Sequence, residues 1–161
     1  MADRSAFEGF YREHLARVIR ACRLVLLDRA EAEDVAAEAF ARLWSKWGSI
    51  NDDHHAGGFV YTTAMRLCAR RGRRARTAPV TDETAASDEV ARSLDREEIA
   101  RALRTLSVRQ RQAVVLRDWA GFDTAEVARL LGMREPTVRV HLHRARVHLR
   151  EALRMEEETA R

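Results

Sequence analysis

Apolar residues recur every three or four positions along most of the chain, which is the spacing of one face of an α-helix. In the first half this pattern predicts three helices: one that carries Phe7 to Val25, one that begins at Asp28 and one that begins near Gly58. Glu31 follows Asp28 by three residues, which is a helix-capping signature. No segment alternates between apolar and polar residues as a strand does. The pattern therefore predicts an all-α protein.

The second half is expected to contain four helices. Three capping boxes, in which an acid or amide follows the cap by three residues, start at Asp95, Ser107 and Asp123. They predict three short helices, over residues 99–106, 109–119 and 124–131. A last helix is expected to begin near Glu135 and Pro136, because proline fits the first turn of a helix.

Residues 77–93 are poor in large apolar side chains, contain Pro79 and follow a cluster of arginines. Such a composition predicts a flexible linker. The linker divides the chain into two small helical domains, residues 1–76 and residues 94–161.

Residues 124–146 have the spacing of a helix-turn-helix, in which Gly132 separates a short helix from a longer basic one. Its expected interior positions are apolar: Val127, Leu131, Val138, Leu142, Ala145 and Leu149. Their burial turns another face of the last helix outward, and that face carries Arg139, Val140, His143 and Arg144. Arginine can grip a guanine edge with two hydrogen bonds, and valine can touch a thymine methyl. We therefore predict that this face of the last helix contacts the base edges of DNA.

The charges of the 161 residues come in blocks, which the net charge of +4 conceals. Acidic residues dominate residues 28–38, whereas residues 66–76 contain arginines and no acid. Residues 134–150 are rich in arginine and histidine. A single lysine, Lys46, stands among the 29 basic residues, and arginine is the better partner for phosphates and carboxylates. These blocks predict one acidic surface and two basic ones.

Several classes of function are not expected. No apolar run reaches the length of a membrane span, and residues 1–4 do not begin a signal peptide, so we expect a cytoplasmic protein with no membrane insertion. Cys22 and Cys68 lie inside helical patterns, which argues against a disulfide framework. His141 and His143 point to different faces of a helix, so we expect no metal site. With no glycine-rich phosphate loop and no nucleophile arrangement, the sequence predicts a protein without cofactors that is not an enzyme.

Two sets of motifs resemble the extracytoplasmic-function (ECF) sigma factors. Residues 102–116, 121–128 and 137–146 are similar to region 4 of that family, and residues 28–44 to its region 2 core-binding segment, in an actinobacterial style. The motifs occur in the family's order with a linker between them. The resemblance implies a promoter-recognition subunit that binds core RNA polymerase and promoter DNA. It also implies a second protein partner, an anti-sigma factor that holds it inactive.

The resemblance implies three groups of site residues. The group for core polymerase has two carboxylates on one helical face, and it comprises Asp34, Glu38, Phe40, Arg42 and Trp44. The group for the −10 element combines aromatic and basic side chains: Phe59, Tyr61, Arg66, Arg70, Arg71, Arg73 and Arg74. The group for the −35 element comprises Arg134, Thr137, Arg139, Val140, His143, Arg144 and Arg146. Of the two aromatic residues, we expect Phe59 to belong to the core.

Two other functions stay open from the sequence. A stand-alone helix-turn-helix regulator would bind DNA through residues 94–161 without polymerase. A degenerate sigma mimic would sequester an anti-sigma factor and open no promoter. Departures from the family pattern keep the mimic open, and they are Gly57, Gly58, Arg66 and the run Arg134, Glu135 and Pro136.

Overall fold

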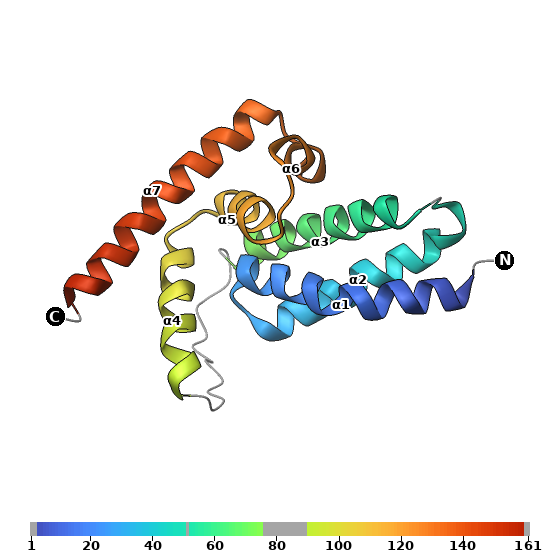
Figure 1. Ribbon diagram of the computed structural model, residues 1–161, viewed down its shortest axis with the longest axis horizontal. Coiled ribbons are helices and arrows are strands. Elements are labelled where there is room, and N and C mark those ends of the chain that lie inside the picture. The colour runs from blue at the N-terminus through green and yellow to red at the C-terminus, as the bar shows by residue number, and fades with distance from the viewer. Residues whose placement is uncertain (1–2, 51, 76–89, 160–161) are drawn as a thin grey trace.

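The computed structural model describes residues 3–50, 52–75 and 90–159, and helices account for most of them (Figure 1). The α-helices in chain order are α1 (Arg4–Leu26), α2 (Arg29–Lys46), α3 (Asp53–Ala75), α4 (Val90–Arg104), α5 (Val108–Val114), α6 (Thr124–Leu131) and α7 (Glu135–Thr159). The 3-10 turn η1 (Trp47–Ser49) and the π turn η2 (Val115–Trp119) complete the set. These described ranges contain no strand, so the predicted all-α class is confirmed.

Helices α1, α2 and α3 form the first bundle, in which each helix packs against the other two. Its fully buried positions repeat at helical spacing and include Val18 and Cys22 of α1, Leu43 of α2 and Cys68 of α3. Both cysteines are free thiols, and a hydrogen bond from Cys22 together with burial raises the pKa of Cys68. The pair therefore belongs to the apolar interior, as the helical pattern predicts.

Helix α3 begins five residues before the predicted start at Gly58. Asp52 accepts a hydrogen bond of 2.8 Å from the backbone amide of His55 and lies 2.8 Å from the imidazole Nδ1 of the same residue. These contacts hold the pKa of Asp52 below its ordinary value. An aspartate in this position satisfies a free amide of the first turn, so the helix starts at Asp53 and runs through both glycines.

Helices α4 to α7 form the second bundle, in which α7 packs against α4, α5 and α6. The capping boxes at Ser107 and Asp123 are both formed, so these two predictions are confirmed. Gly132 ends α6 with a φ of 63°, a left-handed conformation that glycine adopts without strain. The predicted helix over 109–119 is α5 followed by the π turn η2. All six predicted interior positions of the helix-turn-helix are buried or half-buried.

The predicted start of a helix at Asp95 is wrong, because α4 already begins at Val90 and its backbone continues through this residue. The same helix overlaps with the segment predicted as a linker, residues 77–93. Residues 77–89 lie outside the described residues, and residues 90–93 belong to α4.

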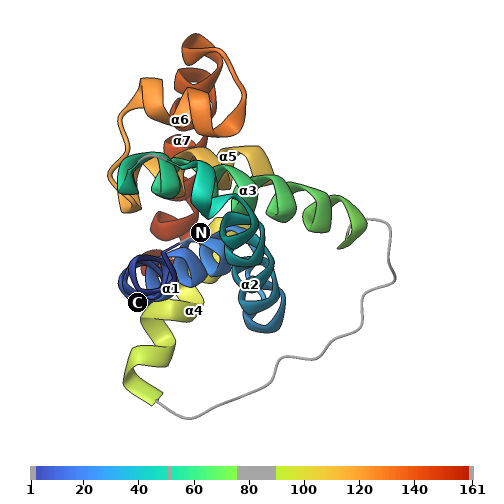
Figure 2. The ribbon, with the colours of Figure 1, turned by 90° about the vertical axis from the view of Figure 1, so that its right-hand side faces the viewer.

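The two bundles pack directly against each other, with α3 beside α5 and α6, and α1 beside α5 and η2 (Figures 1 and 2). Gln112 of α5 is completely buried, and its amide donates a 2.7 Å hydrogen bond to the backbone carbonyl of Met65 in α3. Arg17 of α1 donates to the carbonyl of Ala120 at 3.2 Å. Buried apolar residues of both bundles form one continuous core. The two halves therefore share an interior.

We expect Gln112→Leu to lower the free energy of unfolding by about 1–3 kcal/mol, because it removes a buried hydrogen bond between the halves. Urea unfolding measures this change. The matched control is Gln110→Leu, since Gln110 contributes only a local capping contact to Ser107. Equal destabilisation by both substitutions would contradict a specific role for Gln112 at the junction.

Candidate protein and nucleic-acid interfaces

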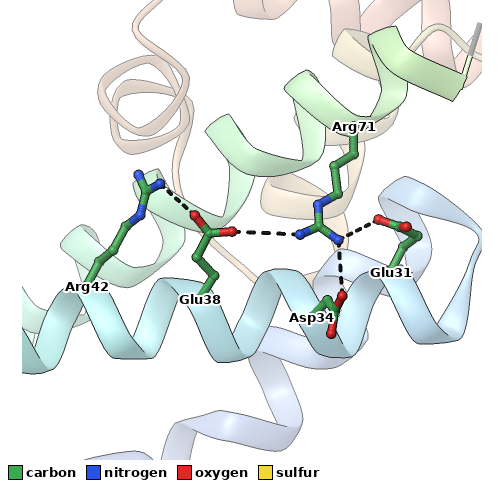
Figure 3. A network of polar contacts seen from close by, with 5 residues as sticks. All are labelled: Glu31, Asp34, Glu38, Arg42 and Arg71. Carbon is green, nitrogen blue, oxygen red and sulfur yellow. Dashed lines mark hydrogen bonds and ion pairs between the residues drawn. The ribbon is translucent and has the colours of Figure 1, made fainter.

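Three carboxylates of α2 lie on one side of the helix, which we call the acidic face: Glu31, Asp34 and Glu38 (Figure 3). Their spacing of three and four residues brings them together. Arg71 of α3 reaches among them, with its Nη1 2.5 Å from Glu31 Oε2 and 3.6 Å from Asp34 Oδ2. Its Nη2 lies 3.7 Å from Glu38 Oε2, and Arg42 Nη2 lies 2.6 Å from the other oxygen of Glu38.

The acidic face remains available to a partner despite these contacts. The side chain of Arg71 is 25% exposed, whereas that of Asp34 is 76% exposed. The hydrogen bond to Glu31 raises the pKa of Arg71, so the guanidinium stays charged. Within this network of five residues, three carboxylates face two guanidiniums, which leaves one net negative charge.

The structure brings Asp34, Glu38 and Arg42 together, as predicted for the polymerase group. Two further residues, Glu31 and Arg71, belong to the same network, although the sequence analysis does not place them in that group. Arg71 was grouped with the DNA-contacting arginines, and Glu31 was noted only as part of a cap. The position of Glu31, three residues before Asp34 and seven before Glu38, already indicated a shared helical face. No pattern in the sequence pairs that face with α3.

The two aromatic residues of the same predicted group have different environments. Phe40 is 2% exposed and its ring centroid lies 5.0 Å from that of Tyr11, so it supports α2 from inside the core. Trp44 is 41% exposed and lies 4.9 Å from the ring of Phe7. Of these two residues, Trp44 is the one that offers a substantial exposed apolar surface on α2.

The aromatic residues near the start of α3 reverse one expectation. Tyr61, not Phe59, is the buried one, and its ring packs edge-on against Phe122 of the second bundle at 5.1 Å. Burial raises the pKa of Tyr61. Phe59 is half-buried and lines a cleft of about 830 Å³ that α1 and α3 form with α6. The four remaining predicted arginines of α3 are exposed: Arg66, Arg70, Arg73 and Arg74.

The exposed face of α7 carries the residues that the helix-turn-helix spacing turned outward. Arg139, Val140, His143 and Arg144 are all exposed, as are Arg134 and Thr137 near the start of the helix. Arg139 pairs with Glu135 at 2.6 Å.

Two further features of the second bundle do not follow from the sequence pattern: the partner of Arg146 and the environment of His141. Arg146 makes two hydrogen bonds, of 2.7 and 3.1 Å, to the carboxylate of Asp118, which raises the pKa of Arg146. Asp118 therefore orients this arginine. Burial, with the charges of Arg144 and Arg109, lowers the pKa of His141, so its half-buried imidazole is neutral at pH 7.

Comparisons with known proteins find two family models that match separate parts of the chain. The family model "Sigma-70 region 2" matches residues 10–77, and "Sigma-70, region 4" matches residues 96–149. The ECF RNA polymerase sigma factor SigM of Mycobacterium tuberculosis is 33% identical over 150 residues, which cover 91% of this chain and 76% of SigM. The RNA polymerase sigma-E factor of Streptomyces coelicolor is 31% identical over 157 residues, which cover 95% and 89% of the two chains.

Two solved structures have a similar arrangement of helices. The sigma factor RpoE in complex with the anti-sigma factor NepR from Bartonella quintana has a TM-score of 0.73 at 22% identity, and covers 92% of this chain and 97% of its own. CnrH in complex with the cytosolic domain of CnrY has a TM-score of 0.73 at 20% identity, over 95% and 90% of the two chains. These likenesses establish the fold.

We expect Arg71→Gln to lower the free energy of unfolding by about 1 kcal/mol, because three carboxylates then lose a shared counter-charge. The loss should shrink in 1 M salt, which screens the remaining repulsion. Arg12→Gln is the matched control, because Arg12 is exposed on α1 and lies outside the network. Thermal unfolding at low and high salt measures both, and a salt-independent loss would contradict the electrostatic explanation.

Proposed function

The chain belongs to the extracytoplasmic-function sigma factors of the sigma-70 family, and we propose how its residues divide the work of such a factor. It binds core RNA polymerase and directs promoter-specific initiation of transcription. In our proposal, residues 1–76 contact the core enzyme and the −10 element, and residues 94–161 contact the −35 element. Residues 77–93 join them. The extents of the two family-model matches, 10–77 and 96–149, support this division.

The acidic face of α2 is the contact for core polymerase in this proposal, and the observation that carries it is the network around Arg71. Side chains held by a network are already ordered, so less conformational entropy is lost when a partner binds. The excess negative charge suits a basic surface of the polymerase. Trp44 adds exposed apolar area six residues beyond Glu38, near the end of α2, and Phe40 supports the helix from within.

The exposed face of α7 is the contact for the −35 element. Arg139, Val140, His143 and Arg144 supply guanidinium, apolar and imidazole groups on one surface, which are suited to base edges. Arg134, Thr137 and Arg146 suit phosphates, which set the register of the helix on DNA. The pairing of Arg146 with Asp118 holds that guanidinium in one orientation.

The −10 element has two kinds of contact in this proposal. Phe59 is the aromatic residue suited to stacking on an unpaired base, because Tyr61 is committed to the junction with Phe122. Arg66, Arg70, Arg73 and Arg74 are exposed along α3 and suit the phosphates of a strand. Arg71 contributes to this group only indirectly, since its guanidinium faces α2.

Partners and location follow from the same proposal. An anti-sigma factor is a suitable partner for this chain, as it is for the RpoE structure named above. A protein that acts on RNA polymerase works in the cytoplasm, through binding alone and without catalysis of its own. No helix in the described ranges is long and apolar enough to cross a membrane.

We expect the wild-type chain to co-elute with core RNA polymerase, and Asp34→Ala/Glu38→Ala to lose at least tenfold in affinity, because two charges of the acidic face are gone. Glu8→Ala/Glu33→Ala is the matched control. It also removes two exposed carboxylates with helical ion pairs, but neither belongs to the acidic face. Failure of the wild-type chain to co-elute would refute the proposal and favour a stand-alone DNA-binding regulator.

We expect Arg144→Ala to reduce transcription from a cognate promoter about tenfold or more, because a good arginine contact to a base contributes roughly 1–3 kcal/mol. The promoter is first recovered from a random DNA library with the assembled holoenzyme, and run-off transcription is then measured. Arg154→Ala, on the same helix beyond the reading face, is the control and should retain activity. A wild-type holoenzyme that assembles yet initiates from no promoter would instead favour the degenerate mimic.

A further inference from the structure

A small cleft lies where α3 meets α5 and α6, and arginines surround it. Its volume is about 280 Å³. Four apolar residues line it: Met65, Ala69, Leu130 and Leu131. Four arginines complete the lining: Arg66, Arg70, Arg73 and Arg109. None of these lining residues is an acid.

The close approach of α5 to α3 builds this cleft. Gly72 has no side chain, and a Cβ atom there would lie only 2.8 Å from Cγ2 of Val108. One turn further along α5, the buried amide of Gln112 is hydrogen-bonded to the carbonyl of Met65. Arg109 lies between these two contacts, and its Nη1 donates to Oε1 of Gln112 at 3.3 Å. The fold therefore holds Arg109 of the second bundle opposite the arginines of the first.

The arginines of α3 that line the cleft have no counter-charge within the described part of the chain. Arg66, Arg70 and Arg73 follow each other at four and three residues and share one side of α3. Arg71 faces a different side, where it takes up the carboxylates of α2. Guanidiniums gathered around a small space repel one another, so the packed arrangement of the two bundles carries an electrostatic cost there.

We propose that this cleft binds a small polyphosphate anion, either inorganic or the polyphosphate group of a nucleotide. Guanidinium groups form paired, charge-assisted hydrogen bonds with phosphate oxygens, and several phosphates in one molecule match several arginines. The cleft lies at the small end of ligand sites, which fits a compact anion and excludes a duplex. Because its arginines come from both bundles, the bound anion stabilises their packed arrangement. This site is separate from the polymerase contact on α2, and it shares Arg66, Arg70 and Arg73 with the proposed contact to the −10 element.

The test is calorimetric titration of the full chain with inorganic tripolyphosphate at constant ionic strength. We expect the wild-type chain to bind, and Arg70→Gln and Arg109→Gln each to weaken binding about tenfold or more, as loss of a charged hydrogen bond does. Arg12→Gln removes the same charge from an exposed position of α1 outside the cleft and should bind normally. Absence of wild-type binding, or an equal loss in Arg12→Gln, overturns the proposal.

The variant Gly72→Leu tests the shape of the cleft separately from the charges that line it. This variant keeps all four arginines but forces α5 away from α3, so we expect a loss of affinity of at least tenfold with helical content unchanged by circular dichroism. Binding as tight as that of the wild-type chain would overturn a site shared by both bundles. Titration with a nucleoside triphosphate distinguishes the two sources of the ligand. An affinity equal to that for tripolyphosphate shows that only the phosphates are recognised. A higher affinity shows that the nucleoside also contacts the apolar lining of the cleft. Binding of the nucleotide without that of tripolyphosphate contradicts the proposal.

Discussion

The position of α3 against both bundles is the constraint on which the rest of the structure depends. One side of the helix buries Val60, Ala64 and Cys68 among α1 and α2. Another side meets α5, where the missing side chain of Gly72 admits Val108 and the carbonyl of Met65 accepts the amide of Gln112. Protein interiors are packed densely, so a helix with two sets of neighbours leaves little freedom at either. The orientation of the second bundle follows from these contacts.

Helix α3 also places neighbouring arginines in different environments. Successive residues of an α-helix are rotated by about 100°, because one turn takes 3.6 residues. Arg70 and Arg71 are neighbours in the chain, yet one lines the cleft beside α5 and the other is held by the carboxylates of α2. The side of the helix on which an arginine lies, and not the composition of the segment, therefore decides which charges it pairs with.

The proposed contact surfaces differ in whether one bundle or both bundles contribute residues to them. The acidic face of α2 and the reading face of α7 remain exposed while the bundles are together. Phe59 and three exposed arginines of α3, Arg66, Arg70 and Arg73, line clefts to which residues of the second bundle also contribute. In our proposal the polymerase and the −35 element thus each meet a surface of one bundle, whereas contacts to the −10 element lie beside the junction between the bundles.

The sequence by itself determined the helices, their caps and the direction of their apolar faces, because all three depend on residues within about one turn of each other. The exposed side of α7 and the shared face of Asp34 and Glu38 follow from that periodicity alone. Local patterns misjudged the start of α3, where Asp52 outweighs two glycines, and the start of α4, which is Val90 and not Asp95. They also misjudged the choice between Phe59 and Tyr61. Only the tertiary structure decided that Arg71 pairs with α2, that Asp118 orients Arg146 and that Arg109 joins the arginines of α3. Each of these joins residues distant in the chain, whose meeting depends on how whole helices cross.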